Sequence, residues 1–393
     1  MATQQDRPSH DAAPGGFTRR RALATATAAG VAIAAPHVRR AHAAGTLRML
    51  IWQDYNIAET VAEFEQATGA TVAPAFFDGN SEAFNKMKAG GTEDFDLVMA
   101  DGFWPRLYLR DGLIQPLDES KLPNLANLFT DFQPGSYDLL HDKPGGVRIG
   151  ANNCWGSYGI TMNTTHIPEE ERDSLEVMFN EKYRGHLATG ARFEENIAMA
   201  GILAATHMGT KDQERPDGQP FNPYKLTDAE LETAKQLLIR QKGLLVTRYQ
   251  DYDSLQKLMR PGLVWASPEF SEIYRRLTRA RRAGEIDFDV VHTLQPKEGG
   301  LGWIDSWQIS SAVKGEMLDL AHAWINHYVS KDSMYRVAMK GVAPCYDVRA
   351  MLPPDEVSLL MLDRTVELRG LHMFDQPSSP EKWERVWSEV EAA

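Results

Sequence analysis

The stretch that decides the fold runs from Thr46 to Phe77 and reads "TLRMLIWQDYNIAETVAEFEQATGATVAPAFF". Its apolar start, 46–52, predicts a strand, and 71–77 predicts a second one. Between them, apolar residues recur at helical spacing until Gly69: Ile57, Val61 and Phe64. A strand, a helix and a strand in this order predict two parallel strands covered by a helix.

The same alternation continues toward the middle of the chain. Residues 81–91 predict a short helix with Ser81 as its cap, and 95–100 a third strand. A stretch rich in proline and glycine, 116–150, then interrupts the pattern. Ligands of parallel sheets bind beyond the carboxyl ends of the strands. We therefore expect functional side chains near 52–55 and 100–103.

A second alternating region follows this interruption. The expected strands are 154–163, 262–267, 286–294 and 303–313. The expected helices are 193–208, 227–241, 269–283 and 316–329. Thr227 and Glu230 have the spacing of a capping box at a helix start. The chain is therefore long enough, and patterned in the right way, for two α/β cores.

The N-terminus has the order of an export signal. Residues 18–24, "TRRRALA", resemble a twin-arginine motif, an apolar run covers 22–35, and "AHAAG" offers a cleavage site after Ala43. A membrane anchor is the alternative, but the apolar run has 14 residues, whereas a span needs roughly 20. We expect residues 1–43 to be a twin-arginine signal peptide and the mature protein to work in the periplasm.

The net charge of the chain limits the classes of partner that it could bind. The formal charge of −12 becomes about −16 once six arginines and two aspartates of the predicted signal are removed. This balance argues against nucleic acid and anionic lipid and is compatible with a cationic ligand. An acidic surface without a binding role would give the same charge. Of the two cysteines, Cys154 and Cys345, we expect free buried thiols, with a disulfide as the alternative.

Aromatic residues stand beside acidic or hydroxyl residues at four expected strand ends. These segments are "WQDY" (52–55), "WGSY" (155–158), "VWASPEF" (264–270) and "GWIDSW" (302–307). Aromatic rings attract an organic ammonium by roughly 0.5 to 2 kcal/mol each, and a carboxylate supplies charge-assisted hydrogen bonds. A core tryptophan beside a surface acid is the alternative for any one segment. Four such segments together favour a binding site for an organic cation.

No sequence motif indicates catalysis. The chain contains no G-x-S-x-G, H-E-x-x-H, C-x-x-C or P-loop pattern, and its eleven histidines lack metal-ligand spacing. We therefore expect no enzymatic activity, no cofactor and no metal site. A secreted enzyme remains a remote alternative.

Several segments resemble the periplasmic polyamine-binding proteins, the putrescine- and spermidine-binding components of ABC importers. They are "LIWQDYNIAETVAEFEQATGATV", "FDLVMADGFWPRLYLRDGLIQPLD", "VWASPEF" and "TLQPKEGGLGWIDSWQISSAVK". The resemblance implies a type II periplasmic binding fold with two α/β lobes joined by three crossings. It also implies a monomer that closes on its ligand and is then recognised by a membrane permease. The implied lobes are 46–150 plus 288–340 and 151–287 plus 341–393.

The resemblance also implies a set of ligand-binding residues: Trp52, Asp54, Tyr55, Asp101, Trp155, Ser157, Glu194, Trp265, Glu269, Asp305 and Tyr346. Asp101, or alternatively Phe103, stands where the family usually has a serine. The acid after Trp265 comes one residue later than in the family, as Glu269.

The acidic contact near 194 is Glu194 or Glu195. Arg192 lies close to it, and an arginine would favour a ligand with a carboxylate or phosphonate. The leading expectation is therefore a polyamine, and the alternative is an amino-acid, opine-like or aminophosphonate zwitterion.

Overall fold

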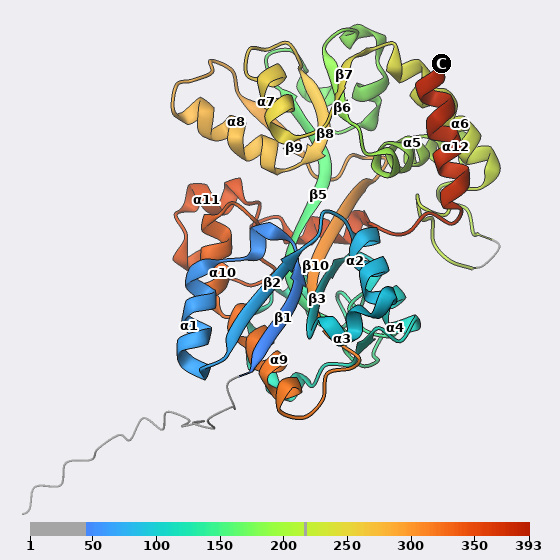
Figure 1. The fold of residues 1–393 in the computed structure, drawn as a ribbon. Coiled ribbons are helices and arrows are strands. Elements are labelled where there is room, and N and C mark those ends of the chain that lie inside the picture. Colours follow the sequence, from blue (N-terminus) through green and yellow to red (C-terminus); the bar gives the residue numbers. More distant parts are fainter. Residues whose placement is uncertain (1–44, 216–217) are drawn as a thin grey trace, which may run out of the picture. The chain divides into compact units, whose positions relative to one another are not determined.

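The computed structural model describes residues 45–215 and 218–393, and these residues form an α/β fold (Figure 1). The predicted signal peptide, 1–43, lies outside the described residues. The strands are β1 (Thr46–Ile51), β2 (Thr71–Phe76), β3 (Leu97–Asp101), β4 (Ile114–Gln115), β5 (Ala151–Asn163), β6 (Leu187–Gly190), β7 (Leu245–Tyr249), β8 (Ala266–Phe270), β9 (Val290–Thr293), β10 (Gly300–Ser310) and β11 (Leu371–Met373).

Helices lie between these strands. They are α1 (Ala58–Thr68), α2 (Asn80–Lys86), α3 (Thr92–Asp94), α4 (Trp104–Arg110), α5 (Phe193–Met208), α6 (Asp228–Lys242), α7 (Tyr252–Met259), α8 (Glu272–Arg282), α9 (Gly315–Tyr328), α10 (Lys331–Met339), α11 (Pro354–Leu359) and α12 (Pro380–Ala392). Short helices of three to six residues fill the connections, and η1 (Gln53–Tyr55) is the one that matters for the site.

The first lobe contains the predicted strand-helix-strand unit. β1 pairs in parallel with β2 on one side and with β3 on the other. The intervening helix α1 ends at Gly69, which has φ +74°, a left-handed conformation that glycine adopts without steric cost. The prediction of a parallel sheet with helical connections is therefore confirmed for this part of the chain.

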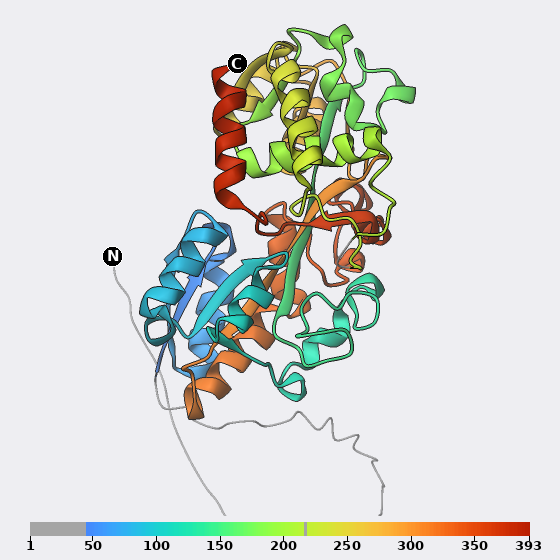
Figure 2. The same ribbon diagram turned by 90° about the vertical axis from the view of Figure 1, so that its right-hand side faces the viewer.

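The second lobe is built around β5, β8, β6 and β7, which are neighbours in this order. Its helices α5 and α6 pack together, and α12 lies alongside α6 near the C-terminus (Figure 2). The two longest strands, β5 and β10, pair antiparallel and run from one lobe into the other (Figures 1 and 2). Each lobe has its own hydrophobic core.

The core of the first lobe extends further along the sequence than expected. Residues from Ala343 to Met373 contribute buried side chains to the same cluster as Leu47. Phe374, in contrast, packs against the cluster of the second lobe. Since core membership defines a lobe physically, we place the third crossing near 373–374, whereas the sequence suggested that it lies near 340.

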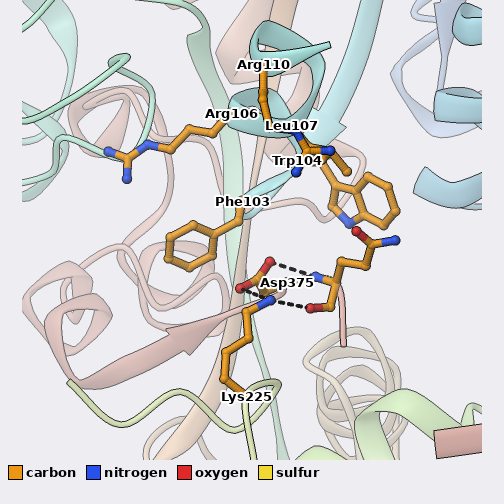
Figure 3. A pocket seen from close by; sticks show the side chains of 8 residues that line it. Phe103, Trp104, Arg106, Leu107, Arg110, Lys225 and Asp375 are labelled. Atoms are coloured by element: carbon orange, nitrogen blue, oxygen red, sulfur yellow. Dashed lines mark hydrogen bonds and ion pairs between the residues drawn. The ribbon is translucent and has the colours of Figure 1, made fainter. Parts of the chain in front are cut away.

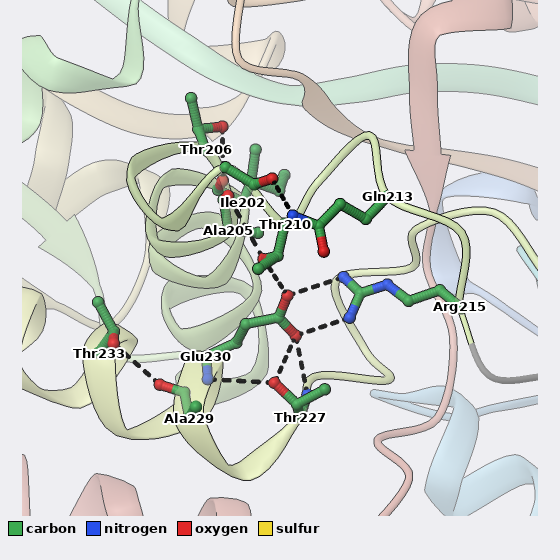
Figure 4. Close-up of polar contacts among 11 residues, drawn as sticks. Ile202, Ala205, Thr206, Thr210, Gln213, Arg215, Thr227, Ala229, Glu230 and Thr233 are labelled. Atoms are coloured by element: carbon green, nitrogen blue, oxygen red, sulfur yellow. Dashed lines mark hydrogen bonds and ion pairs between the residues drawn. The ribbon is translucent and has the colours of Figure 1, made fainter.

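The predicted capping box at the start of α6 is present (Figure 4). The N–H of Thr227 donates to Glu230 Oε2 at 2.9 Å, and the N–H of Glu230 donates to Thr227 Oγ1 at 3.3 Å. Arg215 donates to both oxygens of the same carboxylate, at 3.0 and 2.8 Å. Burial alone would raise the pKa of Glu230, but the donors, Arg215 foremost, outweigh it and lower the pKa to about 2.

Two local predictions differ from the structure. Helix α2 begins at Asn80 with Gly79 as its N-cap, so Ser81 is not the capping residue. The strand expected over 262–267 is β8, Ala266–Phe270. It starts later because Gly262 adopts φ +74° and closes a turn onto Met259. This shift carries Glu269 from the expected start of the helix 269–283 into a buried strand.

The remaining expectations concern thiols and membranes. Cys154 and Cys345 are both free and buried. Among the described residues, no helix combines the length and the apolar character needed to cross a bilayer.

Candidate functional site

Two aspartates lie opposite each other where β3 and β10 meet. Asp101 ends β3 and is paired in antiparallel register with Asp305 of β10. Residues directly opposite in such a pair place their side chains on one face, with Cβ atoms roughly 5 Å apart. The two residues are only 7% and 6% exposed, and Asp101 Oδ1 has no hydrogen-bond partner among the described residues. We call these two residues the acidic pair.

The aromatic residues at the end of β1 lie beside the acidic pair. Tyr55 donates its hydroxyl hydrogen to Asp305 Oδ2. The carbonyl of Tyr55 in turn accepts a hydrogen bond of 2.8 Å from the Tyr328 hydroxyl, which fixes the position of η1. Trp52, half-buried, packs against Phe77 with ring centroids 4.2 Å apart. The stretch quoted first thus supplies one wall of the site.

Burial raises the pKa of both carboxyl groups in the acidic pair. It raises the pKa of Asp101 to about 7, although a hydrogen bond from Asn80 acts in the opposite direction. It raises the pKa of Asp305 well above its usual range, and the charge of Asp101 adds to this effect. The Tyr55 hydroxyl and the Trp52 N–H lower the pKa of Asp305. The Trp52 N–H acts from a distance, since it has no hydrogen-bond partner among the described residues. Among the described residues, no cationic side chain acts on either carboxyl group.

A second charged group belongs to the other lobe. Arg192 Nη1 donates to Glu269 Oε1 at 3.0 Å, and the Arg192 guanidinium lies 5.0 Å from the ring centroid of Phe270. Glu195, in the first turn of α5, has an oxygen, Oε2, that is buried without a hydrogen-bond partner in the described part of the chain. Burial raises the pKa of Glu195 to about 7 even though Arg192 lowers it. We call Arg192, Glu195 and Glu269 the arginine-glutamate group.

Aromatic side chains occupy the region between the two charged groups. Phe270 contacts Tyr158, Phe374 and Trp303, with ring centroids 5.3, 6.0 and 6.2 Å apart. Trp303 stands two residues before Asp305 on β10, a separation of about 7 Å along a strand. The site therefore combines carboxyl groups with rings, as four segments of the sequence suggested.

Tyr224 interacts electrostatically with members of both charged groups. Its pKa is raised by burial and then by the negative charges of Glu195 and Asp101. Because such interactions weaken with distance, this hydroxyl group lies within electrostatic reach of both charged groups. Its ring contacts Phe374 with centroids 6.5 Å apart.

Phe374 approaches Asp101 because the residue after Asp101 is a glycine. Gly102 has φ +49°, and a Cβ atom there would lie 2.1 Å from the Phe374 carbonyl oxygen. The N–H of Phe374 donates to Gly302 O at 2.9 Å, and its carbonyl accepts from the Phe103 N–H at 2.9 Å. The sequence offered Asp101 or Phe103 for the position where the family usually has a serine. Phe103 is half-buried, and of the two only Asp101 can supply a charge.

Three other residues of the expected set are buried and contact other protein groups, although the indole N–H of Trp155 has no hydrogen-bond partner among the described residues. Trp155 is buried in the core of the first lobe, 5.8 Å from Phe132 between ring centroids. Ser157 shares a hydrogen bond of 3.1 Å with His292, and Tyr346 donates to Asn152 O at 2.8 Å.

Trp265 lies apart from the acidic pair and the arginine-glutamate group. It precedes β8, whereas Glu269 stands at the far end of that strand. Its indole is stacked between His186 and His166, with centroid distances of 3.5 and 4.0 Å, and donates to Gly262 O at 2.9 Å. The structure therefore does not bring this ring to the side chains near Asp305.

The last two expected residues lie at the edge of the site. Asp54 is exposed on η1 between Trp52 and Tyr55. Glu194 is half-buried in the first turn of α5, and burial raises its pKa. Both carboxyl groups therefore add negative charge near the two ends of the site.

The sequence did not single out the rings that connect the two charged groups. Trp303 could have been found, because a residue two positions before Asp305 shares its side of a strand. Tyr158 belongs to the segment "WGSY" but was not expected as a ligand-binding residue. Tyr224 and Phe374 carry no such signal, since their positions depend on how distant segments pack.

A cavity of about 250 Å³ adjoins the site (Figure 3). Arg106 and Arg110 line it, and Lys225 forms an ion pair of 3.2 Å with Asp375 on its wall. Because its charged side chains are mostly basic, this cavity does not suit a cation. No group of side chains in the described residues has the composition of a metal site.

The chain was compared with protein families, curated proteins and solved structures. No family model matches the chain. The chain is 24% identical over 301 residues to the putrescine-binding periplasmic protein PotF of Escherichia coli, covering 75% of each chain. It is 24% identical over 271 residues to the spermidine/putrescine-binding periplasmic protein of the same organism, covering 69% of each.

Solved structures extend the likeness to nearly all of the fold. A putative spermidine/putrescine ABC transporter from Listeria monocytogenes superposes with a TM-score of 0.68 at 21% identity, covering 88% of this chain and 98% of that one. AgtB from A. tumefaciens R10, solved in complex with agropinic acid, gives a TM-score of 0.54 at 16% identity, covering 89% and 98%.

The fold matches that of the type II periplasmic binding proteins, as predicted. In sequence, the chain is similar at 24% identity to periplasmic proteins that bind putrescine or spermidine.

Proposed function

We propose that the protein captures a polyamine of the putrescine or spermidine type in the periplasm and delivers it to an ABC permease. The observation that carries this proposal is the acidic pair, whose two buried carboxyl groups face no cation among the described residues. A buried charge is costly unless it is paired, and an organic ammonium supplies the missing partner. The names of the relatives support the same ligand class.

The two charged groups suit the ammonium groups of a linear polyamine. One ammonium would lie between Asp101 and Asp305, with Trp52 and Tyr55 beside it. The methylene chain would pass the ring of Trp303, and a longer polyamine of the spermidine type would extend past Phe270 toward Glu195. Affinity in the micromolar range corresponds to about −8 kcal/mol, a magnitude that two charge-assisted contacts and several rings can supply.

A zwitterionic ligand fits this site less well. Arg192 is the cation that a ligand carboxylate would need, but it already donates to Glu269 and lies over Phe270. A ligand carboxylate at Arg192 would have to share the guanidinium with Glu269, a buried carboxyl group that is only 2% exposed. Glu195 adds a further negative charge at this end. These contacts favour a dication.

Isothermal titration calorimetry on refolded protein tests the proposal. Putrescine and spermidine should bind, 4-aminobutyrate should not, and Asp305→Asn should weaken putrescine binding at least tenfold. Asp363→Asn, a change at an exposed aspartate, is the matched control and should leave the affinity unchanged. Binding of 4-aminobutyrate but not of the diamines would replace the proposal with the zwitterion.

We also propose export through the twin-arginine pathway, since the motif at 18–24 precedes an apolar run and a cleavage site. Residues 1–43 fused to a reporter should direct it to the periplasm. Lysine in place of Arg19 and Arg20 should stop export, whereas lysine in place of Arg39 and Arg40 should not. Export that survives the first change would indicate another route.

A further inference from the structure

The acidic pair raises a question that ligand binding alone does not answer, namely what balances it before a ligand arrives. Asp101 and Asp305 are directly opposite in the β3–β10 ladder, and both are more than nine-tenths buried. Two carboxylates this close cannot both be ionised without a cation between them. Asp101 Oδ1 is buried and without a partner among the described residues.

The groups packed around the pair are neutral at ordinary pH. The charge of Asp305 helps to raise the pKa of four of them: Tyr55, Cys154, Tyr328 and Cys345. Those that sense Asp101 are Tyr108, Tyr137 and Tyr224. Burial raises the pKa of each of these phenols and thiols, so they keep their protons.

Other nearby contacts do not balance the charge either. Asn80 supplies a neutral oxygen to the N–H of Asp101. Arg106 on α4 donates instead to the carbonyls of Asp138 and His141, at 2.9 and 3.1 Å. Counter-charge for the acidic pair must therefore come from a proton or from a ligand.

We propose that the ligand-free protein holds at least one proton on the Asp101–Asp305 pair, and that an ammonium entering the site displaces this proton into solvent. This inference rests on the proposed function and goes beyond it, because it makes solute capture a cation-for-proton exchange. The exchange is balanced: a singly protonated pair and an ammonium give two carboxylates bridged by the ammonium, plus one released proton. Asp101 strengthens the exchange, since its negative charge adds to the effect of burial on Asp305.

The sign of the pH effect follows from this exchange. If binding releases a proton, higher pH favours binding, and the affinity for putrescine should rise by up to about tenfold per pH unit between pH 5 and 7 for each proton released. The ligand itself remains charged in this range, because amines of the lysine type titrate near pH 10.

Calorimetry with putrescine in buffers of different ionisation enthalpy measures the number of protons released. We expect about one proton per putrescine at pH 7. Glu195→Gln removes the other carboxyl group whose pKa lies near neutrality, and proton release should persist in this variant. Combining it with Asp101→Asn should reduce the release clearly. Putrescine binding whose enthalpy is the same in all buffers would overturn the proton exchange and leave the polyamine function standing.

A ligand-free measurement keeps the inference testable even if no diamine binds. Infrared spectra of the protein at pH 7 should contain the band of a protonated carboxyl group, and this band should weaken in Asp101→Asn but not in Asp363→Asn. If the three proteins gave identical spectra, the pair would hold no proton and the inference would be wrong.

Discussion

Replacing Asp101 by asparagine should stabilise the ligand-free protein at pH 8 while it weakens putrescine binding. The folded protein raises the pKa of Asp101 from 3.8 to about 7. A carboxyl group with a raised pKa costs stability as the pH rises from its unfolded to its folded pKa. At pH 8 this difference corresponds to roughly 4 kcal/mol, at about 1.36 kcal/mol per pH unit. Asparagine does not ionise and avoids the cost.

Urea denaturation at pH 4.5 and pH 8 provides the assay. The free energy of unfolding of Asp101→Asn should exceed that of the natural protein by on the order of 4 kcal/mol at pH 8 and by about 1 kcal/mol at pH 4.5. Asp363→Asn should differ little at either pH. An Asp101→Asn protein that is equally stable or less stable at pH 8 would refute the reasoning, because the carboxyl group would then not be strained by burial.

Three further substitutions separate binding from folding. In Gly156→Ala the new Cβ would lie 2.7 Å from the Trp303 ring. Overpacking of this kind costs about 1 to 3 kcal/mol. The putrescine affinity, measured by tryptophan fluorescence, should therefore fall about tenfold. Tyr55→Phe removes the hydroxyl donor of Asp305; calorimetry should show weaker putrescine binding, with a stability loss of about 1 kcal/mol. Trp265→Ala should lower the melting temperature by several degrees, since it empties a stacked site, and leave the calorimetric affinity unchanged.

A control variant and the contradicting results for these three substitutions are as follows. Gly190→Ala is the control for Gly156→Ala, because its Cβ would meet its nearest atom only at 3.4 Å. Equal losses of affinity in the two alanine variants would argue against a role of Trp303. Unchanged binding in Tyr55→Phe would separate this residue from the site, and lost binding in Trp265→Ala would restore the role that the sequence suggested for that ring.

The sequence predicted the fold well because the relevant patterns are local. The run from Thr46 to Phe77 carries its own strand and helix periods, and the structure reproduces them as β1, α1 and β2. Boundaries were less accurate where a turn overrides composition. The positive φ of Gly262 delays β8 by several residues.

The sequence predicted the site only in part, because proximity depends on register. Asp305 was recognisable, but only the pairing of β3 with β10 places it opposite Asp101. Trp155 resembled a ligand-binding ring in the sequence, yet it packs in a core against Phe132. The resemblance to a family located the segments, whereas packing decided which side chains in them face one another.

The measurement that tests the central claim most directly is a crystal structure of the protein with putrescine bound. The account predicts one terminal nitrogen within hydrogen-bonding distance of both Asp101 and Asp305, with the methylene chain against Trp303. A diamine bound elsewhere, for example beside Trp265, with the acidic pair still separate from any cation, would contradict it.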